Sequence, residues 1–170
     1  MNAEIRNKEI LSLKTFLSGV HKKHSYINWG GCCVFAGILG KHLAEVGKVR
    51  IRVINSMYEG GSVNIDHVRK KIRKNESLEW NRHGIGFNHV VVEFAYKRRK
   101  YVMDSEGIRV LTPDLDKRYV EGALTVKEAQ ELGSTQRGWN PMFNREEIPA
   151  IRTKVQRYFK TFIQDGKLTS

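Results

Sequence analysis

A glycine pair that runs into two cysteines and an apolar helix constrains this chain more than any other stretch. Residues 29–33 read Trp-Gly-Gly-Cys-Cys, and apolar side chains then recur at helical spacing at Phe35, Ala36, Leu39 and Leu43. This pattern predicts a helix over about 32–46, buried on most of one face and closed by Gly47. A cysteine in the first turn of a helix lies beside unpaired backbone N–H groups and the positive end of the dipole, which favour thiolate. Cys32 is therefore a candidate nucleophile; the alternative is a buried helix with two inert cysteines.

The length of 170 residues fits one domain with its own core. The first 14 residues mix charged and apolar side chains without a continuous apolar stretch, so no signal peptide is predicted. No apolar run reaches the length of a membrane span, and we expect a cytoplasmic protein. Two adjacent cysteines do not form a disulfide framework, which agrees with a reducing compartment.

The net charge of +12, from 30 basic and 18 acidic residues, favours an acidic partner. Nucleic acid, anionic lipid, an acidic protein and a cell-wall polymer all fit this charge. Runs of charge are more often solvated faces or turns than binding sites. The candidate basic patch comprises Arg69, Lys70, Lys71, Arg73, Lys74, Lys97, Arg98, Arg99 and Lys100.

Periodicity elsewhere predicts an α+β fold. Helices are expected over about 3–20, 64–74, 125–132 and 145–164. Strands are expected at 49–54, 87–96, 100–104, 108–111 and 119–124, the second and third forming a hairpin that turns at 97–99. Thr125 and Glu128 have the spacing of a capping box. In this scheme the N-terminal helices pack on a small antiparallel sheet, followed by a C-terminal helix.

The chain is predicted to form a single domain without an interdomain linker. Residues 1–47 make its helical part, 48–124 its sheet part, 125–164 its C-terminal helices and 165–170 a tail.

The expected hairpin carries a histidine and an aspartate at one end. His89 is near the start of its first strand and Asp104 is at the end of the second, so their side chains come roughly opposite each other. An aspartate that accepts from one ring nitrogen fixes the tautomer and leaves the other nitrogen for a thiol. If the helix that starts at Cys32 packs on this end, the three side chains form a nucleophile, a base and an orienting group. The alternatives are a core histidine and a plain Asp-Ser-Glu-Gly turn.

Three blocks resemble the papain-like and transglutaminase-like cysteine enzyme superfamily: Gly31–Ala36, Asn88–Val92 and Tyr101–Gly107. In that pattern an aromatic residue often stands three positions after the nucleophile, as Phe35 does after Cys32. The resemblance implies a papain-like α+β fold and attack by a thiol on an amide or thioester. It does not imply a particular substrate; the expected partner is a protein, peptide or other amide substrate. The short chain and early cysteine are more similar to small phage and bacterial members.

The remaining site residues are predicted around Cys32. No glutamine precedes it, so Asn28, the nearest side-chain amide, is the candidate oxyanion donor together with the backbone N–H of Cys32. Candidate substrate-binding residues are Trp29, Gly31, Asn88 and Trp139, although core packing explains a tryptophan equally well. No Cys or His pair has the spacing of a zinc site, so we predict neither a metal nor a cofactor.

Two classes of function remain open besides a cysteine hydrolase or acyltransferase. One is an inactive papain-like fold whose basic surface binds nucleic acid or an acidic protein. The other is a structural or host-interaction protein of a bacteriophage, a source that only the resemblance suggests.

Overall fold

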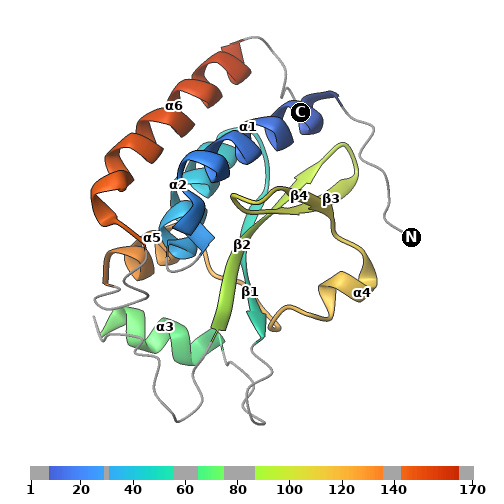
Figure 1. The fold of residues 1–170 in the computed structure, drawn as a ribbon. Coiled ribbons are helices and arrows are strands. Elements are labelled where there is room, and N and C mark those ends of the chain that lie inside the picture. The colour runs from blue at the N-terminus through green and yellow to red at the C-terminus, as the bar shows by residue number, and fades with distance from the viewer. Residues whose placement is uncertain (1–7, 29–30, 56–64, 75–86, 136–142, 165–170) are drawn as a thin grey trace.

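The computed structural model describes residues 8–28, 31–55, 65–74, 87–135 and 143–164, which form an α+β fold (Figure 1). Its helices are α1 (Lys8–Lys23), α2 (Cys32–Leu43), α3 (Ile65–Arg73), α4 (Pro113–Asp116), α5 (Val126–Thr135) and α6 (Ile148–Gln164). Two 3-10 turns are η1 (Ser25–Asn28) and η2 (Arg145–Glu147). Its strands are β1 (Val49–Asn55), β2 (Phe87–Tyr96), β3 (Arg99–Met103) and β4 (Ile108–Val110), which form an antiparallel sheet in the order β1-β2-β3-β4.

Strand β2 pairs on both sides, with Val49 opposite Phe94 in β1 and Met103 opposite Val92 in β3, and it is also the strand on which α2 packs. Alternate residues of a strand point to opposite faces. Val92 and Phe94 accordingly belong to the main core, whereas Val91 packs with Val102 and Tyr119 in a small second cluster.

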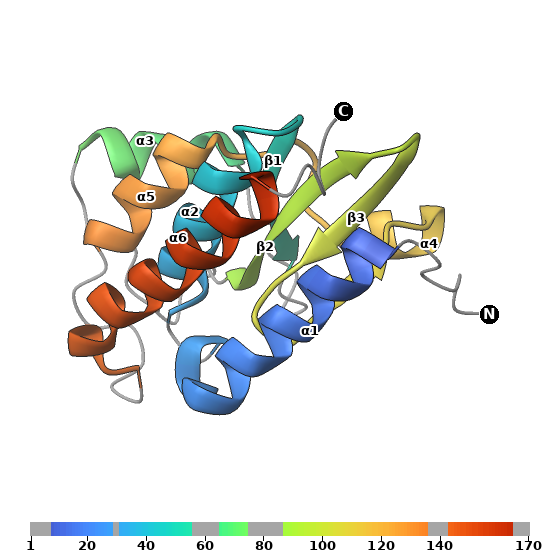
Figure 2. The ribbon, with the colours of Figure 1, turned by 90° about the horizontal axis from the view of Figure 1, so that it is seen from above.

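The helices lie mainly on one side of the sheet. Helix α2 packs on β2, α5 and α6 lie outside α2, and α4 lies on the opposite face (Figure 2). Helix α1 lies beside α6, where the rings of Phe16 and Tyr158 stack with their centroids 4.0 Å apart. Helix α2 is buried almost all round, which explains its predominantly apolar sequence. Within the described ranges, no helix combines the length and the apolar character needed to cross a bilayer.

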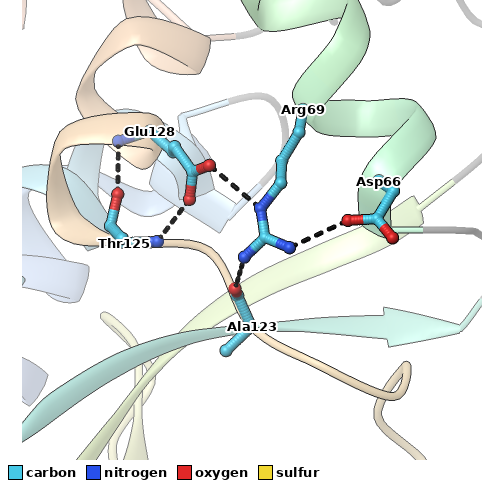
Figure 3. Close-up of polar contacts among 5 residues, drawn as sticks. All are labelled: Asp66, Arg69, Ala123, Thr125 and Glu128. Atoms are coloured by element: carbon cyan, nitrogen blue, oxygen red, sulfur yellow. Dashed lines mark hydrogen bonds and ion pairs between the residues drawn. The ribbon is translucent and has the colours of Figure 1, made fainter.

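The predicted capping box at the start of α5 forms and is extended by an arginine from α3 (Figure 3). The Glu128 N–H donates to Thr125 Oγ1 at 3.1 Å, and the Thr125 N–H donates to Glu128 Oε2 at 2.7 Å. Arg69 donates to Glu128 Oε1 at 3.0 Å, to Asp66 Oδ1 at 3.0 Å and to the Ala123 carbonyl. The guanidinium thus holds α3 against α5, and Arg69 is not an unpaired cation of a basic surface.

The structure differs from the sequence predictions at several places, among them the end of α1, which lies at Lys23 and not at residue 20. Helix α2 ends at Leu43, three residues before the predicted end. Instead of an edge strand over 119–124, only isolated bridges form, between Tyr119 and Ile54 and between Leu124 and Ile51. Helix α4 was not predicted; Thr112 caps it by accepting from the Leu115 N–H, and a proline occupies its first turn.

The turn between β2 and β3 is built without glycine. Lys97 and Arg98 have φ angles of 45° and 63°, the left-handed conformation that a two-residue type I′ hairpin turn requires. Residues with a Cβ adopt this conformation at a cost, because Cβ approaches the following carbonyl oxygen.

Replacing this pair by Asn-Gly (Lys97→Asn with Arg98→Gly) should raise the midpoint of thermal unfolding by about 2–4 °C, since the strain is relieved. The control is Lys97→Ala with Arg98→Ala, which removes the same charges but keeps the strain and should give no stabilisation. An equal rise in both variants would show that charge, not backbone geometry, is responsible.

A buried ion-pair network joins α4 to the sheet. Arg52 donates to Glu93 Oε2 at 2.8 Å and lies 2.9 Å from Asp116 Oδ1, with its guanidinium 5.1 Å from the centroid of the Tyr119 ring. Arg52 and Glu93 are both buried. Removing the Glu93 charge would leave the buried Arg52 with the more exposed Asp116 as counter-ion, which compensates its charge less well.

Glu93→Gln should therefore lower the free energy of unfolding by about 3 kcal/mol, measured by chemical denaturation. The matched control is Asp114→Asn, because Asp114 forms an exposed pair with Lys117 at 3.5 Å. This control should change the free energy by less than about 0.5 kcal/mol. Equal effects of the two substitutions would contradict the role of burial.

Candidate active site

Cys32 is the first residue of α2, and the packing around Gly31 fixes its place. A Cβ at Gly31 would lie 2.7 Å from the Ile27 carbonyl oxygen and 2.9 Å from the Phe143 ring. Gly31 has a φ of −100°, so glycine is required there by close approach rather than by a left-handed backbone. Among the described residues no side chain caps this helix end, which leaves the first backbone N–H groups of α2 and the positive end of its dipole beside Cys32.

The Cys32 sulfur is surrounded by hydrogen-bond donors although its residue is only 3% exposed. It forms hydrogen bonds with the Cys33 thiol, the His89 ring and the backbone N–H of Val90. The bond from Cys33 does most to hold the pKa of Cys32 well below its usual value; burial opposes this shift, and the bond from His89 and its positive charge add to it. The thiolate is therefore the favoured form.

The base and its orienting carboxylate lie on neighbouring strands. His89 Nε2 donates to Asp104 Oδ2 at 2.8 Å, so Nδ1 is the ring nitrogen left for Cys32. The other oxygen, Asp104 Oδ1, accepts from the backbone N–H groups of Glu106 and Gly107 at 2.8 and 3.2 Å. The aspartate thus shapes the turn after β3 and orients the histidine at the same time, one role for each oxygen.

The charges of this site support one another. Burial lowers the pKa of His89, but hydrogen bonds with Asp104 and Cys32 and the negative charges of both outweigh it and raise the pKa to about 10. Burial raises the pKa of Asp104, yet the hydrogen bond and charge of His89 and the two turn N–H groups bring it below its usual value. The favoured state at neutral pH is a thiolate–imidazolium pair with an ionised aspartate behind it.

A cavity of about 260 Å³ opens beside the histidine and the aspartate. Asn28, Arg109 and Tyr119 line it together with His89 and Asp104. Asn28 Nδ2 is buried and has no hydrogen-bond partner in the part of the chain that the structure describes. An unpaired buried amide is costly, and such donors recur where a ligand supplies the missing acceptor.

The other predicted site residues have mixed outcomes. Trp29 and Trp139 lie outside the described residues, and so does the side chain of Asn88, whose backbone belongs to β2. Gly31 directly precedes Cys32, but the packing described above fills the space next to it.

The part of the predicted basic patch at residues 97–100 lies away from the site. Residues 97–100 follow the far end of β2, roughly 25 Å from His89 at the usual rise per strand residue. In α3, Arg69 is held by internal contacts and the side chain of Lys71 lies outside the described residues. Lys70 and Arg73 are exposed, and so is Lys74 directly after the helix.

Sequence reasoning missed three residues near the site. Arg109 and Tyr119 line the cavity, and the fully buried Ser105 hydrogen-bonds to Asn28. Ser105 had one available signal, its position directly after Asp104. Arg109 and Tyr119 had none, because only the sheet and the segment after α4 bring them next to His89.

No protein-family model matches this chain, and neither a curated protein nor a solved structure is significantly similar to it. Among the described residues, no group of three or more His, Cys, Asp or Glu side chains is arranged to hold a metal ion. The functional assignment therefore depends on the geometry of Cys32, His89 and Asp104.

Iodoacetamide should alkylate Cys32 at a rate that changes little as the pH falls from about 9 through neutrality. The lowered pKa of Cys32 keeps the thiolate as the pH falls, and the raised pKa of His89 keeps the imidazolium until about pH 10. At pH 6 the rate should exceed that of a free thiol by about a hundredfold. His89→Ala should raise the pKa of Cys32 towards that of an ordinary thiol, so that the rate falls at acidic pH, although the bonds from Cys33 and Val90 remain.

Peptide mass spectrometry distinguishes the two cysteines in this measurement. Cys33→Ser should still be labelled, because a hydroxyl can replace the thiol as donor, whereas Cys32→Ser should not. Labelling of Cys33 alone, or a wild-type profile that follows an ordinary thiol, would contradict an activated Cys32.

Proposed function

We propose that this chain is a papain-like cysteine hydrolase or acyltransferase that acts on amide bonds through Cys32, His89 and Asp104. The observation that carries the proposal is the 2.8 Å bond between His89 Nε2 and Asp104 Oδ2, with Cys32 on the other ring nitrogen. A cysteine that opens a buried helix, a histidine near the start of a strand and an aspartate after the adjacent strand are the features shared with that superfamily.

In the proposed reaction the Cys32 thiolate attacks the substrate carbonyl carbon and forms a C–S bond. The carbonyl electron pair moves to oxygen and returns as the C–N bond breaks. The His89 imidazolium gives its proton to the leaving amine, which yields a thioester on Cys32. Water or an acceptor amine then attacks the thioester, with His89 taking the proton of the attacking group, and the thiolate is restored.

Two donors support the negative oxygen that forms during these steps. The backbone N–H of Cys32 belongs to the uncapped end of α2, and Asn28 Nδ2 is a buried donor with no partner among the described residues. Donors fixed in advance at a developing oxyanion lower the barrier to such a reaction strongly, because they need not reorient as the charge forms.

Treatment with 4-nitrophenyl acetate should acetylate Cys32, seen as a burst of nitrophenolate and as an adduct at Cys32 in the mass spectrum. Cys32→Ser and His89→Ala should abolish the burst. Asp104→Ala should lower the acylation rate by about a hundredfold, because the imidazole loses its orienting partner. Acetylation only at lysines would contradict the proposal.

Asp104→Asn is the sharper variant, since an amide oxygen can still accept from His89 Nε2. It should retain more activity than Asp104→Ala. Because the negative charge that raises the pKa of His89 is lost, the alkaline limb of the rate profile should move to lower pH. An unchanged alkaline limb would mean that Asp104 does not set the ionisation of His89.

A further inference from the structure

The side chain of Ser105 lies between α1 and the candidate oxyanion donor. Its residue is 0% exposed. Its Oγ–H donates to Asn28 Oδ1 at 3.0 Å, and His21 Nδ1 lies 3.4 Å from the same Oγ. Because the one hydroxyl proton goes to Asn28, Ser105 is the acceptor towards His21, and His21 Nδ1 carries a proton.

The direction of the hydrogen bond from Ser105 decides which end of the Asn28 amide has no hydrogen-bond partner among the described residues. An asparagine amide presents an acceptor on one side and two donors on the other. While Ser105 donates to Oδ1, the unpaired end is Nδ2, which is buried in a residue that lines the same cavity as His89 and Asp104. In the flipped amide, Nδ2 would bond to Ser105, and the oxygen left unpaired could not stabilise an oxyanion.

Adjacent residues after β3 therefore hold the two polar groups of the site. Asp104 accepts from the His89 ring, and Ser105 donates to the Asn28 amide. The turn that fixes Asp104 through the N–H groups of Glu106 and Gly107 also fixes the backbone that carries Ser105.

We propose that Ser105 is a positioning residue that, with His21 behind it, holds the Asn28 amide with Nδ2 as oxyanion donor. The proposal rests on the function proposed above and adds to it the group that orients the donor. The hydrogen bonds of the Ser105 hydroxyl go to Asn28 and His21, and in this proposal Ser105 acts through Asn28.

Two reactions of the Cys32 thiolate distinguish a Ser105 that positions the Asn28 amide from a Ser105 that only stabilises the fold. Acylation by 4-nitrophenyl acetate develops an oxyanion on the attacked carbonyl, whereas alkylation by iodoacetamide displaces iodide and develops none there. Asn28→Ala should lower the acylation rate by about a hundredfold, the size usual for one oxyanion donor. Ser105→Ala should lower acylation by about tenfold or more, and alkylation should change by less than about twofold in both variants.

The double variant tests whether Ser105 works through Asn28. Adding Ser105→Ala to Asn28→Ala should cause no further loss of acylation, because residues that act as a unit are not additive. Ser105→Thr keeps the hydroxyl and should restore much of the rate. Ser134→Ala is the matched control, since Ser134 Oγ donates to the Glu131 carbonyl within α5 and should leave both reactions unchanged.

Thermal unfolding establishes that each variant is folded. Should Ser105→Ala fail to fold, Ser105→Cys nearly keeps the volume with a weaker donor and should show the same split, with the label located at Cys32 by mass spectrometry. Equal loss of acylation and alkylation, additive losses in the double variant, or no loss at all would overturn the role of Ser105. A wild-type protein without a Cys32-dependent burst would instead overturn the proposed function, and this inference with it.

Discussion

The contact between the start of α2 and the adjoining ends of β2 and β3 is the constraint on which the candidate site depends. It brings the Cys32 sulfur to His89, whose other ring nitrogen is held by Asp104 at 2.8 Å. Each of the three groups is buried enough to disfavour its own charge, and each is charged because of its neighbours. The thiolate, the imidazolium and the carboxylate therefore stabilise one another as a set, and removing one changes the pKa of the others.

The turn after β3 shows how a short segment can serve both fold and site. Asp104 uses one oxygen to close the turn and the other to hold His89, and Ser105 reaches the Asn28 amide. In the sequence, Asp104 can be interpreted either as a turn residue or as the group that orients the histidine. The two roles are compatible because a carboxylate has two oxygens, each able to accept from a different donor.

Much of the fold could be predicted from the sequence because local patterns carry it. The hairpin formed at the predicted turn, and the pairing of Val92 with Met103 sets Asp104 level with Val91, a diagonal step from His89. The capping box at Thr125 also formed. One failure is non-local. Tyr119 and Leu124 each make one bridge to β1 instead of a strand, and between them the Ala123 carbonyl accepts from Arg69 of α3, a partner that no local pattern indicates. The exposed cations at 97–100 lie far from the site because they follow the end of β2 opposite to His89. The charge composition alone does not indicate which end of a strand its basic residues occupy.

The sequence by itself determined the elements and the residue types at their ends: an apolar helix that opens with cysteine, and a hairpin with histidine and aspartate at one end. These features depend on periodicity and spacing, which neighbouring residues fix. Only the tertiary structure decided that the end of α2 meets that end of the hairpin, that Cys33 donates to Cys32, and that Ser105 reaches Asn28. Such contacts join residues that are far apart in the chain, or they depend on the direction of a side chain. They are determined by how the side chains pack in the core, which no local sequence pattern specifies.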